Sequence, residues 1–227
     1  MHPFVLPALL KFTGVEEGAI RWMYLDNPID KSGKLVGPRL VTVGIGFMIE
    51  PILSYVDQYT GAFTDKDSGH VVGRQAIIDE FNSVKTRTDL VGWPKFEKVT
   101  QLRLNQSFIE DKAKRLLLEK EGALKTDPRV SNYFGNFENF PLDAQLACVS
   151  RAYGRIEMPS SSTKAQAYYD AILAEDWFKA ADNCAVIGWY VPKNQAHETM
   201  FCNAAICAKN NYPKDKLVWP GQFVGTG

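Results

Sequence analysis

Apolar residues are spaced differently in the two halves of the chain. The first half holds two short runs rich in aromatic and β-branched residues, at 20–25 and 40–45, which predict a strand and its return strand. The segment 27–39 between them contains two prolines and two glycines, so it predicts a loop or an elongated hairpin. Leucines at helical spacing precede the first run and predict a helix that runs into Glu17 and stops near Gly18.

The chain from about residue 74 onward is mainly helical in its pattern. Apolar residues recur there at three- and four-residue spacing, which predicts a series of amphipathic helices. These helices are expected at 74–84, from 105 to a stop at Gly122, at 142–153, 163–174, 177–186 and 194–209. The stretch 50–73 predicts irregular structure with a short helix, and the tail 210–227, rich in Pro and Gly, predicts coil or the remnant of a linker.

Two capping boxes mark expected helix starts, Ser107-x-x-Glu110 and Thr163-x-x-Gln166. Pro192 precedes the last predicted helix. The whole pattern therefore predicts an α+β chain that is mostly helical, with its strands confined to a small region near the N-terminus.

Composition narrows the class of protein. A chain of 227 residues suits one large domain or two lobes, and 45% hydrophobic and 23% charged residues are typical of a globular protein. The formal net charge is zero, which argues against a dedicated nucleic-acid binder. No apolar run approaches the ~20 residues that span a bilayer, and the N-terminus lacks the pattern of a secretory signal, so we expect neither membrane insertion nor a signal peptide.

The cysteines indicate no metal or cofactor. Cys148, Cys184, Cys202 and Cys207 lie in the last third, their spacing matches no zinc motif, and HExxH and CxxC are absent from the sequence. We expect small buried thiols. A disulfide remains open for an oxidising compartment, and a nucleophilic Cys148–His197 pair has no local signature.

Two acids stand out at the predicted helix end and strand end. Glu17 directly precedes Gly18, and Asp26 lies nine positions further on. Hydrolysis of a glycosidic bond needs one protonated carboxylic acid and one carboxylate. Glu17, near Trp22 and Tyr24, could lie against apolar walls that favour a neutral acid, whereas Asp26 opens a polar loop that favours charge. We therefore expect the two acids to face one cleft in different protonation states.

These residues carry a resemblance to a known family. The pattern E-G-x-x-x-x-x-Y-x-D from Glu17 to Asp26, followed by T-V-G-I-G from Thr42 to Gly46, resembles the active-site signature of the phage-type (T4-like) lysozymes, which cleave peptidoglycan. The resemblance implies that Glu17 is the general acid, Asp26 the second carboxylate, and Thr42 a residue that helps to hold the attacking water. It also implies a two-lobed lysozyme-like fold and, with net inversion, cleavage of the β-1,4 bond between N-acetylmuramic acid and N-acetylglucosamine.

The same resemblance implies an organisation into lobes. Residues 1–227 would form a single lysozyme-like domain, with a small catalytic β-hairpin lobe at about 13–72. A larger helical lobe would comprise about 73–209 and the first helix, with the helix at 74–84 joining the two lobes and 210–227 as a tail.

The chain departs from the family pattern between the second acid and the threonine. Segment 27–41 is longer than the family's short turn, which makes Asp30 a rival to Asp26. Glu16 is a lesser rival to Glu17, because neighbours on a helix point about 100° apart. Four tryptophans could stack on sugars or belong to the core: Trp93, Trp177, Trp189 and Trp219.

The leading hypothesis is thus a muramidase that lyses bacterial cell walls. Its partner would be peptidoglycan, with no cofactor. A chain made in the cytoplasm without a signal peptide would act in the periplasm or wall of a target bacterium, as a phage endolysin or as the toxic domain of a secretion-system effector with a cognate immunity protein. The alternatives are a non-catalytic wall-binding or interaction module on a lysozyme scaffold, and hydrolysis of chitin by the same carboxylates.

Overall fold

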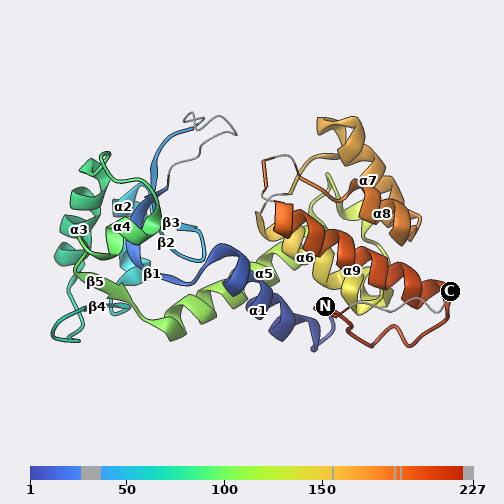
Figure 1. Ribbon diagram of the computed structural model, residues 1–227, viewed down its shortest axis with the longest axis horizontal. Coiled ribbons are helices and arrows are strands. Elements are labelled where there is room, and N and C mark those ends of the chain that lie inside the picture. The colour runs from blue at the N-terminus through green and yellow to red at the C-terminus, as the bar shows by residue number, and fades with distance from the viewer. Residues whose placement is uncertain (27–36, 155, 187, 190, 222–227) are drawn as a thin grey trace. The chain divides into compact units, whose positions relative to one another are not determined.

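The structure is a computed structural model that describes residues 1–26, 37–154, 156–186, 188–189 and 191–221, and for residues 15–17 only the backbone. The chain is α+β and mostly helical, as the sequence predicts (Figure 1). It divides into two compact units. We call Thr13–Ala113 the sheet unit, and Met1–Phe12 together with Lys114–Gly227 the helical unit.

The sheet unit contains two small antiparallel sheets, one with the strand order β1-β2-β3 and one formed by β4 and β5. Its elements are the end of α1 (Val5–Glu17), β1 (Ile20–Asp26), β2 (Leu40–Gly44), β3 (Phe47–Met48), α2 (Ile52–Tyr55), the 3-10 turn η1 (Val56–Tyr59), β4 (Phe63–Asp65), α3 (Arg74–Thr86), α4 (Trp93–Glu97), β5 (Leu102–Leu104) and the start of α5 (Gln106–Thr126). The strands predicted at 20–25 and 40–45 are confirmed as β1 and β2.

One face of the β1–β2 pair forms the core of the sheet unit. Met23 and Leu25 of β1 and Val41 and Val43 of β2 are at most 1% exposed. Helix α3, which packs against both strands, contributes Phe81. The alternation of buried and more exposed positions along β1 is that of a strand with one covered face.

The sheet unit extends further along the chain than the predicted lobe of about 13–72. Strand β5 pairs with β4, with Phe63 opposite Leu104 and Asp65 opposite Leu102. This pairing ties the chain near residue 104 to the residues before 72, so the predicted break cannot fall between them. The division lies inside α5 after Ala113, and α3, predicted to join the lobes, belongs to the sheet unit.

The helical unit is built around α6. Its elements are the start of α1, most of α5, the 3-10 turns η2 (Ser131–Tyr133) and η3 (Phe137–Asn139), α6 (Leu142–Gly154), the 3-10 turn η4 (Pro159–Ser161), α7 (Thr163–Leu173), α8 (Trp177–Asn183) and α9 (Val191–Lys209). Every residue of α6 from Leu142 to Ala152 is buried. A helix that is covered on all sides is the centre of a core rather than an amphipathic surface helix.

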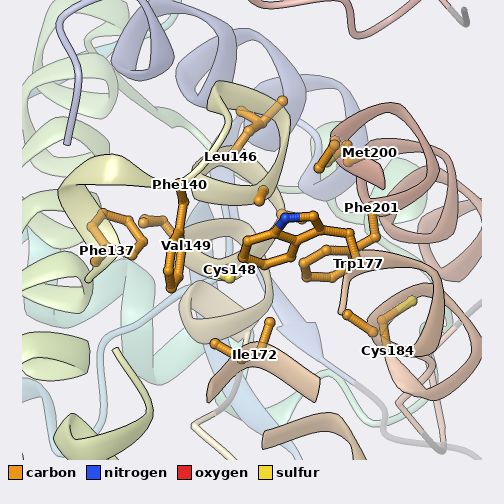
Figure 2. Close-up of a cluster of buried hydrophobic side chains, with 14 of the residues drawn as sticks. Phe137, Phe140, Leu146, Cys148, Val149, Ile172, Trp177, Cys184, Met200 and Phe201 are labelled. Atoms are coloured by element: carbon orange, nitrogen blue, oxygen red, sulfur yellow. The ribbon is translucent and has the colours of Figure 1, made fainter. Parts of the chain in front are cut away.

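Aromatic rings fill the space around α6. Figure 2 shows Trp177 of α8 with Phe140 on one side and Phe201 of α9 on the other. The Trp177 ring meets Phe140 edge to face with centroids 4.8 Å apart and lies parallel to Phe201 at 6.4 Å. Trp177 is 2% exposed, so it belongs to the core and has no surface for a sugar.

Helix α5 begins and ends at residues other than those predicted. It starts at Gln106, so Ser107 lies inside the helix, and Glu110 accepts a hydrogen bond from the Gln106 side chain instead of closing a capping box. The helix also continues through Gly122 to Thr126. A glycine costs a helix only about 1 kcal/mol, and burial of Leu124 one half-turn later offsets that cost.

Two other helix starts are shifted by a few residues. The N-cap of α7 is Ser162, whose hydroxyl accepts from the Ala165 N–H, and the predicted cap Thr163 is the first helical residue. Helix α9 begins at Val191, so Pro192 lies in its first turn. Proline is tolerated there because the N–H groups of a first turn have no helical acceptor.

The tail after α9 is coil, as predicted, yet it is bound to the helical unit. The carboxylate of Asp143 accepts the N–H groups of Val218 and Trp219, each at 2.9 Å, and the side-chain amide of Asn203 at 3.0 Å. Trp219 packs edge to face on Phe12, with ring centroids 5.0 Å apart. Burial raises the pKa of Asp143, and these three donors offset part of the rise. The tail is therefore part of the folded unit.

Within the described residues, no helix has the combination of length and apolar character that crossing a membrane requires.

The described cysteines are all free, and Cys148, Cys184 and Cys207 are buried while Cys202 is half-buried.

A buried histidine lies in the middle of the helical unit. His197 of α9 is fully buried, its Nε2 lies 2.9 Å from the Ser150 hydroxyl, and its Nδ1 has no hydrogen-bond partner among the described residues. Burial, reinforced by the cations of Lys193 and Arg151, lowers the pKa of His197 from 6.5 to about 3. The ring is therefore neutral in the folded protein over the whole physiological range.

We predict that this histidine makes the fold acid-sensitive. Below pH 6.5 the unfolded chain binds a proton that the folded chain does not bind until about pH 3. The free energy of unfolding should therefore fall with decreasing pH in this window, by about 1.4 kcal/mol per pH unit at most. Urea unfolding at several pH values between 7.5 and 4 measures the slope.

The variant His197→Gln should lose this part of the slope, because its amide does not titrate. The same replacement at the exposed His70 is the control and should keep the wild-type slope. A parallel decline of His197→Gln and wild type would show that the buried ring is not the source of the acid sensitivity.

Candidate active site

Helix α1 ends at the position that the sequence predicts. Glu17 is its last residue, and Gly18 follows with a φ of +71°, the left-handed conformation that glycine adopts most easily after a helix. The chain then enters β1 at Ile20. The direction of the Glu17 carboxyl group lies outside what the structure describes, as do the Glu16 side chain and the whole of Asp30.

The register of β1 with β2 brings Asp26 and Thr42 together. Tyr24 lies opposite Thr42 and Asp26 opposite Leu40, so Asp26 and Thr42 are diagonal neighbours on one face of the pair. Diagonal neighbours in an antiparallel pair have α-carbons about 7–8 Å apart. A carboxylate and a hydroxyl at this separation can both contact one water molecule.

The two side chains differ in their environment. Asp26 is exposed, at the open end of β1. Thr42 is 6% exposed, and its hydroxyl donates to the Leu40 carbonyl at 3.2 Å. Because a hydroxyl has one hydrogen and two lone pairs, the Thr42 oxygen retains the capacity to accept a hydrogen bond.

A half-buried ion pair holds the start of β2 in place. The Glu50 carboxylate accepts the Val41 N–H at 2.6 Å and lies 2.6 and 2.7 Å from the Lys85 ammonium of α3. Lys85 also donates to the Arg39 carbonyl at 2.8 Å. Through these contacts α3 positions the residues immediately before Thr42. The sequence contains no signal for this role, since Glu50 and Lys85 are far apart along the chain and match no motif.

The glycines after Thr42 form a tight turn between β2 and β3. Gly44 and Gly46 have φ values of +67° and +81°. A Cβ on Gly44 would lie 2.5 Å from Cδ2 of Phe47, whose ring folds back over the turn. Glycine within a strand often marks a close approach at a bend or at a ligand, and here the approaching group is the protein's own phenylalanine.

The other catalytic pair that the sequence left open, Cys148 with His197, lies in the helical unit. Cys148 does not pair with His197: its Sγ accepts from the Tyr168 hydroxyl at 3.7 Å, and burial raises its pKa to about 12. His197 contacts Ser150 instead, but at 0% and 3% exposure neither side chain can reach a substrate. In the described part of the chain, no three His, Cys, Asp or Glu residues are grouped so that they could hold a metal ion.

The sequence did not distinguish which tryptophans are available for a ligand. Trp93 is 45% exposed at the start of α4, whereas Trp177 is buried. The Trp93 ring lies against Trp22, for which the sequence had suggested only an apolar wall near Glu17. The location of Trp93 immediately after Gly92 in a turn was the one local sign that it would lie at the surface.

Comparison of the chain with models of protein families, with curated proteins and with solved structures found no match in any of the three.

We predict that Gly44→Ala destabilises the sheet unit more than Gly61→Ala. Both glycines have left-handed φ values, +67° and +82°, so both replacements incur a backbone penalty of about 1–2 kcal/mol. A Cβ at Gly61 meets nothing within 4 Å, whereas one at Gly44 meets Phe47. Overpacking should add about 1–3 kcal/mol at Gly44 only.

Thermal and urea unfolding of the two variants measures the difference. Equal losses would mean that the Phe47 ring moves aside without cost and that the turn does not constrain β2.

Proposed function

We propose that the chain is a glycoside hydrolase of the muramidase type, which cleaves the β-1,4 bond between N-acetylmuramic acid and N-acetylglucosamine in peptidoglycan. Glu17 is the general acid, Asp26 is the second carboxylate, and Thr42 helps to orient the attacking water. The proposal rests on the family-like pattern of Glu17–Gly46 and carries over to this chain the roles that the pattern implies.

The observation that supports the proposal best is the register of β1 with β2. Asp26 and Thr42 are sixteen positions apart in sequence, with a long insertion between them, and yet they are diagonal neighbours on one face. Despite the insertion in 27–41, the register therefore keeps Asp26 and Thr42 close together on one face. A catalytic water needs a base and a second polar contact to hold it, and this pair can supply both.

The position of Glu17 agrees with a chemical rather than a stabilising role. It is the last residue of α1, where the partial negative charge of the helix C-terminus makes a carboxylate unfavourable. Because Glu17 gains no stabilisation from the helix dipole at this position, a catalytic role explains it better than a role in stability. In the proposed reaction Glu17 donates its proton to the leaving oxygen while Asp26 takes a proton from water, which attacks from the opposite side with inversion.

Peptidoglycan as substrate implies delivery to a bacterial periplasm or wall. We propose that this delivery is by phage lysis or by a secretion system, and in the second case that a cognate immunity protein protects the producing cell. Isolation of the chain with a tightly bound inhibitor protein would support the effector route, and a holin encoded beside it would support the endolysin route.

We predict that Glu17→Gln abolishes hydrolysis. Loss of a general acid lowers turnover by about 100-fold to 10,000-fold, while the near-isosteric amide keeps the fold. Purified peptidoglycan is digested with each protein and the released muropeptides are identified by mass spectrometry. Glu16→Gln is the matched control and should retain wild-type turnover; a wild-type rate in Glu17→Gln would end the assignment.

We predict that Asp26→Asn loses activity to a similar extent, whereas Asp30→Asn does not. Asp26 is the diagonal neighbour of Thr42. The side-chain amide that the replacement introduces cannot accept the proton of the attacking water. The same muropeptide assay compares the two variants. Loss of activity in Asp30→Asn alone would identify Asp30 as the second carboxylate. Wall binding without released muropeptides in the wild type would favour the non-catalytic module instead.

A further inference from the structure

Two tryptophans of the sheet unit form a pair at its surface. The Trp22 and Trp93 rings have centroids 5.7 Å apart and are tilted by 44°. The Trp22 indole N–H donates to the Trp93 carbonyl at 2.9 Å, which links β1 to the first residue of α4. Trp22 is half-buried and Trp93 is 45% exposed.

The pair is held rigidly from the side of β5. The Arg103 guanidinium lies over the Trp22 ring, 5.4 Å from its centroid. It donates to the carbonyls of Glu97 at 2.9 Å, Leu102 at 2.9 Å and Thr100 at 3.1 Å. These contacts already restrict the side chains of Trp22 and Arg103, so the two side chains would lose little conformational freedom when a ligand binds.

The exposure of Trp93 is unusual for so large an apolar ring. Tryptophan is highly buried on average, and Trp177 of this chain is 2% exposed. An indole that packs against a second indole and leaves a large part of its surface in water suits a recognition site, where flat rings supply contact area at low entropic cost.

Trp22 of the pair lies on the strand that also carries the proposed catalytic aspartate. From Trp22 to Asp26 the more exposed positions alternate with the buried Met23 and Leu25, although the pairing with β2 is irregular between Ile20 and Tyr24. Side chains two and four positions apart in a strand share a face. Tyr24 and Asp26 therefore share a face, and Trp22, in the irregular part of β1, is at most about 13 Å of strand from Asp26.

One cationic group adjoins the pair, and a second belongs to the residue before Trp22 in β1. Arg103 covers Trp22, and Arg21 donates to the Leu104 carbonyl at 2.9 Å. Among the described residues, neither guanidinium has a carboxylate within ion-pair distance. An apolar ring face beside the Arg103 guanidinium suits a ligand with flat apolar faces and an anionic substituent.

We propose that Trp93, supported by Trp22, is a sugar-stacking subsite for the glycan strand that runs to Asp26. The inference rests on the proposed muramidase function and names the residue that would bind the substrate chain away from the cleaved bond. The apolar face of an N-acetylated pyranose ring lies on the Trp93 indole, and Arg103 attracts the carboxylates of the peptide stems. Trp93 makes no contact with the reacting atoms.

The test compares Trp93→Ala with Phe178→Ala, a replacement of an exposed aromatic residue in the helical unit that is 50% exposed. The probe is tetra-N-acetylchitotetraose, titrated into each protein by calorimetry. Loss of the indole should weaken binding at least about ten-fold, while Phe178→Ala should bind as the wild type does. Trp93→Phe, which retains a smaller ring, should fall between them and guards against a folding defect in the alanine variant.

Kinetics on soluble peptidoglycan fragments separate a binding role from a structural one. Trp93→Ala should raise KM about ten-fold or more and leave kcat within about two-fold of wild type. A fall in kcat with unchanged KM, or wild-type values for both, would overturn the subsite.

The two proposals fail in different ways. Wild-type binding and KM in Trp93→Ala, together with an inactive Glu17→Gln, would remove the subsite and leave the muramidase intact. Oligosaccharide binding that depends on Trp93 in a protein that releases no muropeptides would support the subsite and remove the hydrolase. A wild type that neither binds the oligosaccharide nor digests the wall would overturn both.

Discussion

The antiparallel pairing of β1 with β2 determines where the candidate side chains of the sheet unit lie. A slip of one residue in this register would send Asp26 and Thr42 to opposite faces, because side chains alternate along a strand. Two features resist such a slip. Glu50 binds the Val41 N–H and Lys85 at the start of β2, and the turn at Gly44 closes over Phe47 at its end. Both features act on β2. This strand is only five residues long, and the two features hold it in register at its two ends.

The two units use polar groups in different ways. The helical unit buries them: Asp143 binds the tail through three hydrogen bonds, and His197 stays neutral among aromatic rings. Buried polar groups that are well bonded specify one arrangement of a core, and the unpaired His197 Nδ1 is the exception that carries a cost in acid. The sheet unit keeps its largest aromatic pair at the surface, with Arg103 behind it.

Local signals predicted the parts of the fold that depend on neighbouring residues. Glycine after Glu17 marked the end of α1, and alternating aromatic and β-branched residues marked β1 and β2. Strands β4 and β5 were not predicted, because strands of three residues show no periodicity and their pairing joins segments almost forty positions apart. The division of the chain was misplaced for the same reason. Ser162 and Thr163 are both competent caps, so sequence could not choose between them. For the site, only the family resemblance implied that Asp26 and Thr42 belong together, because the spacing between them departs from the family pattern. The difference in exposure between Trp93 and Trp177 depends on packing that no local pattern records.

The hydrogen bond of Thr42 constrains how a water could be held in the proposed reaction. Since the Thr42 hydroxyl gives its hydrogen to the Leu40 carbonyl, it can only accept from a water. A water that donates one hydrogen to Thr42 and the other to the Asp26 carboxylate has both hydrogens engaged, so its lone pairs point away from the strand pair. This is the orientation that attack on a sugar carbon requires, and it follows from the pairing of Leu40 with Asp26 and of Thr42 with Tyr24. The in-strand hydrogen bond therefore makes Thr42 suitable as the acceptor in such an arrangement and unsuitable as a proton donor to the substrate.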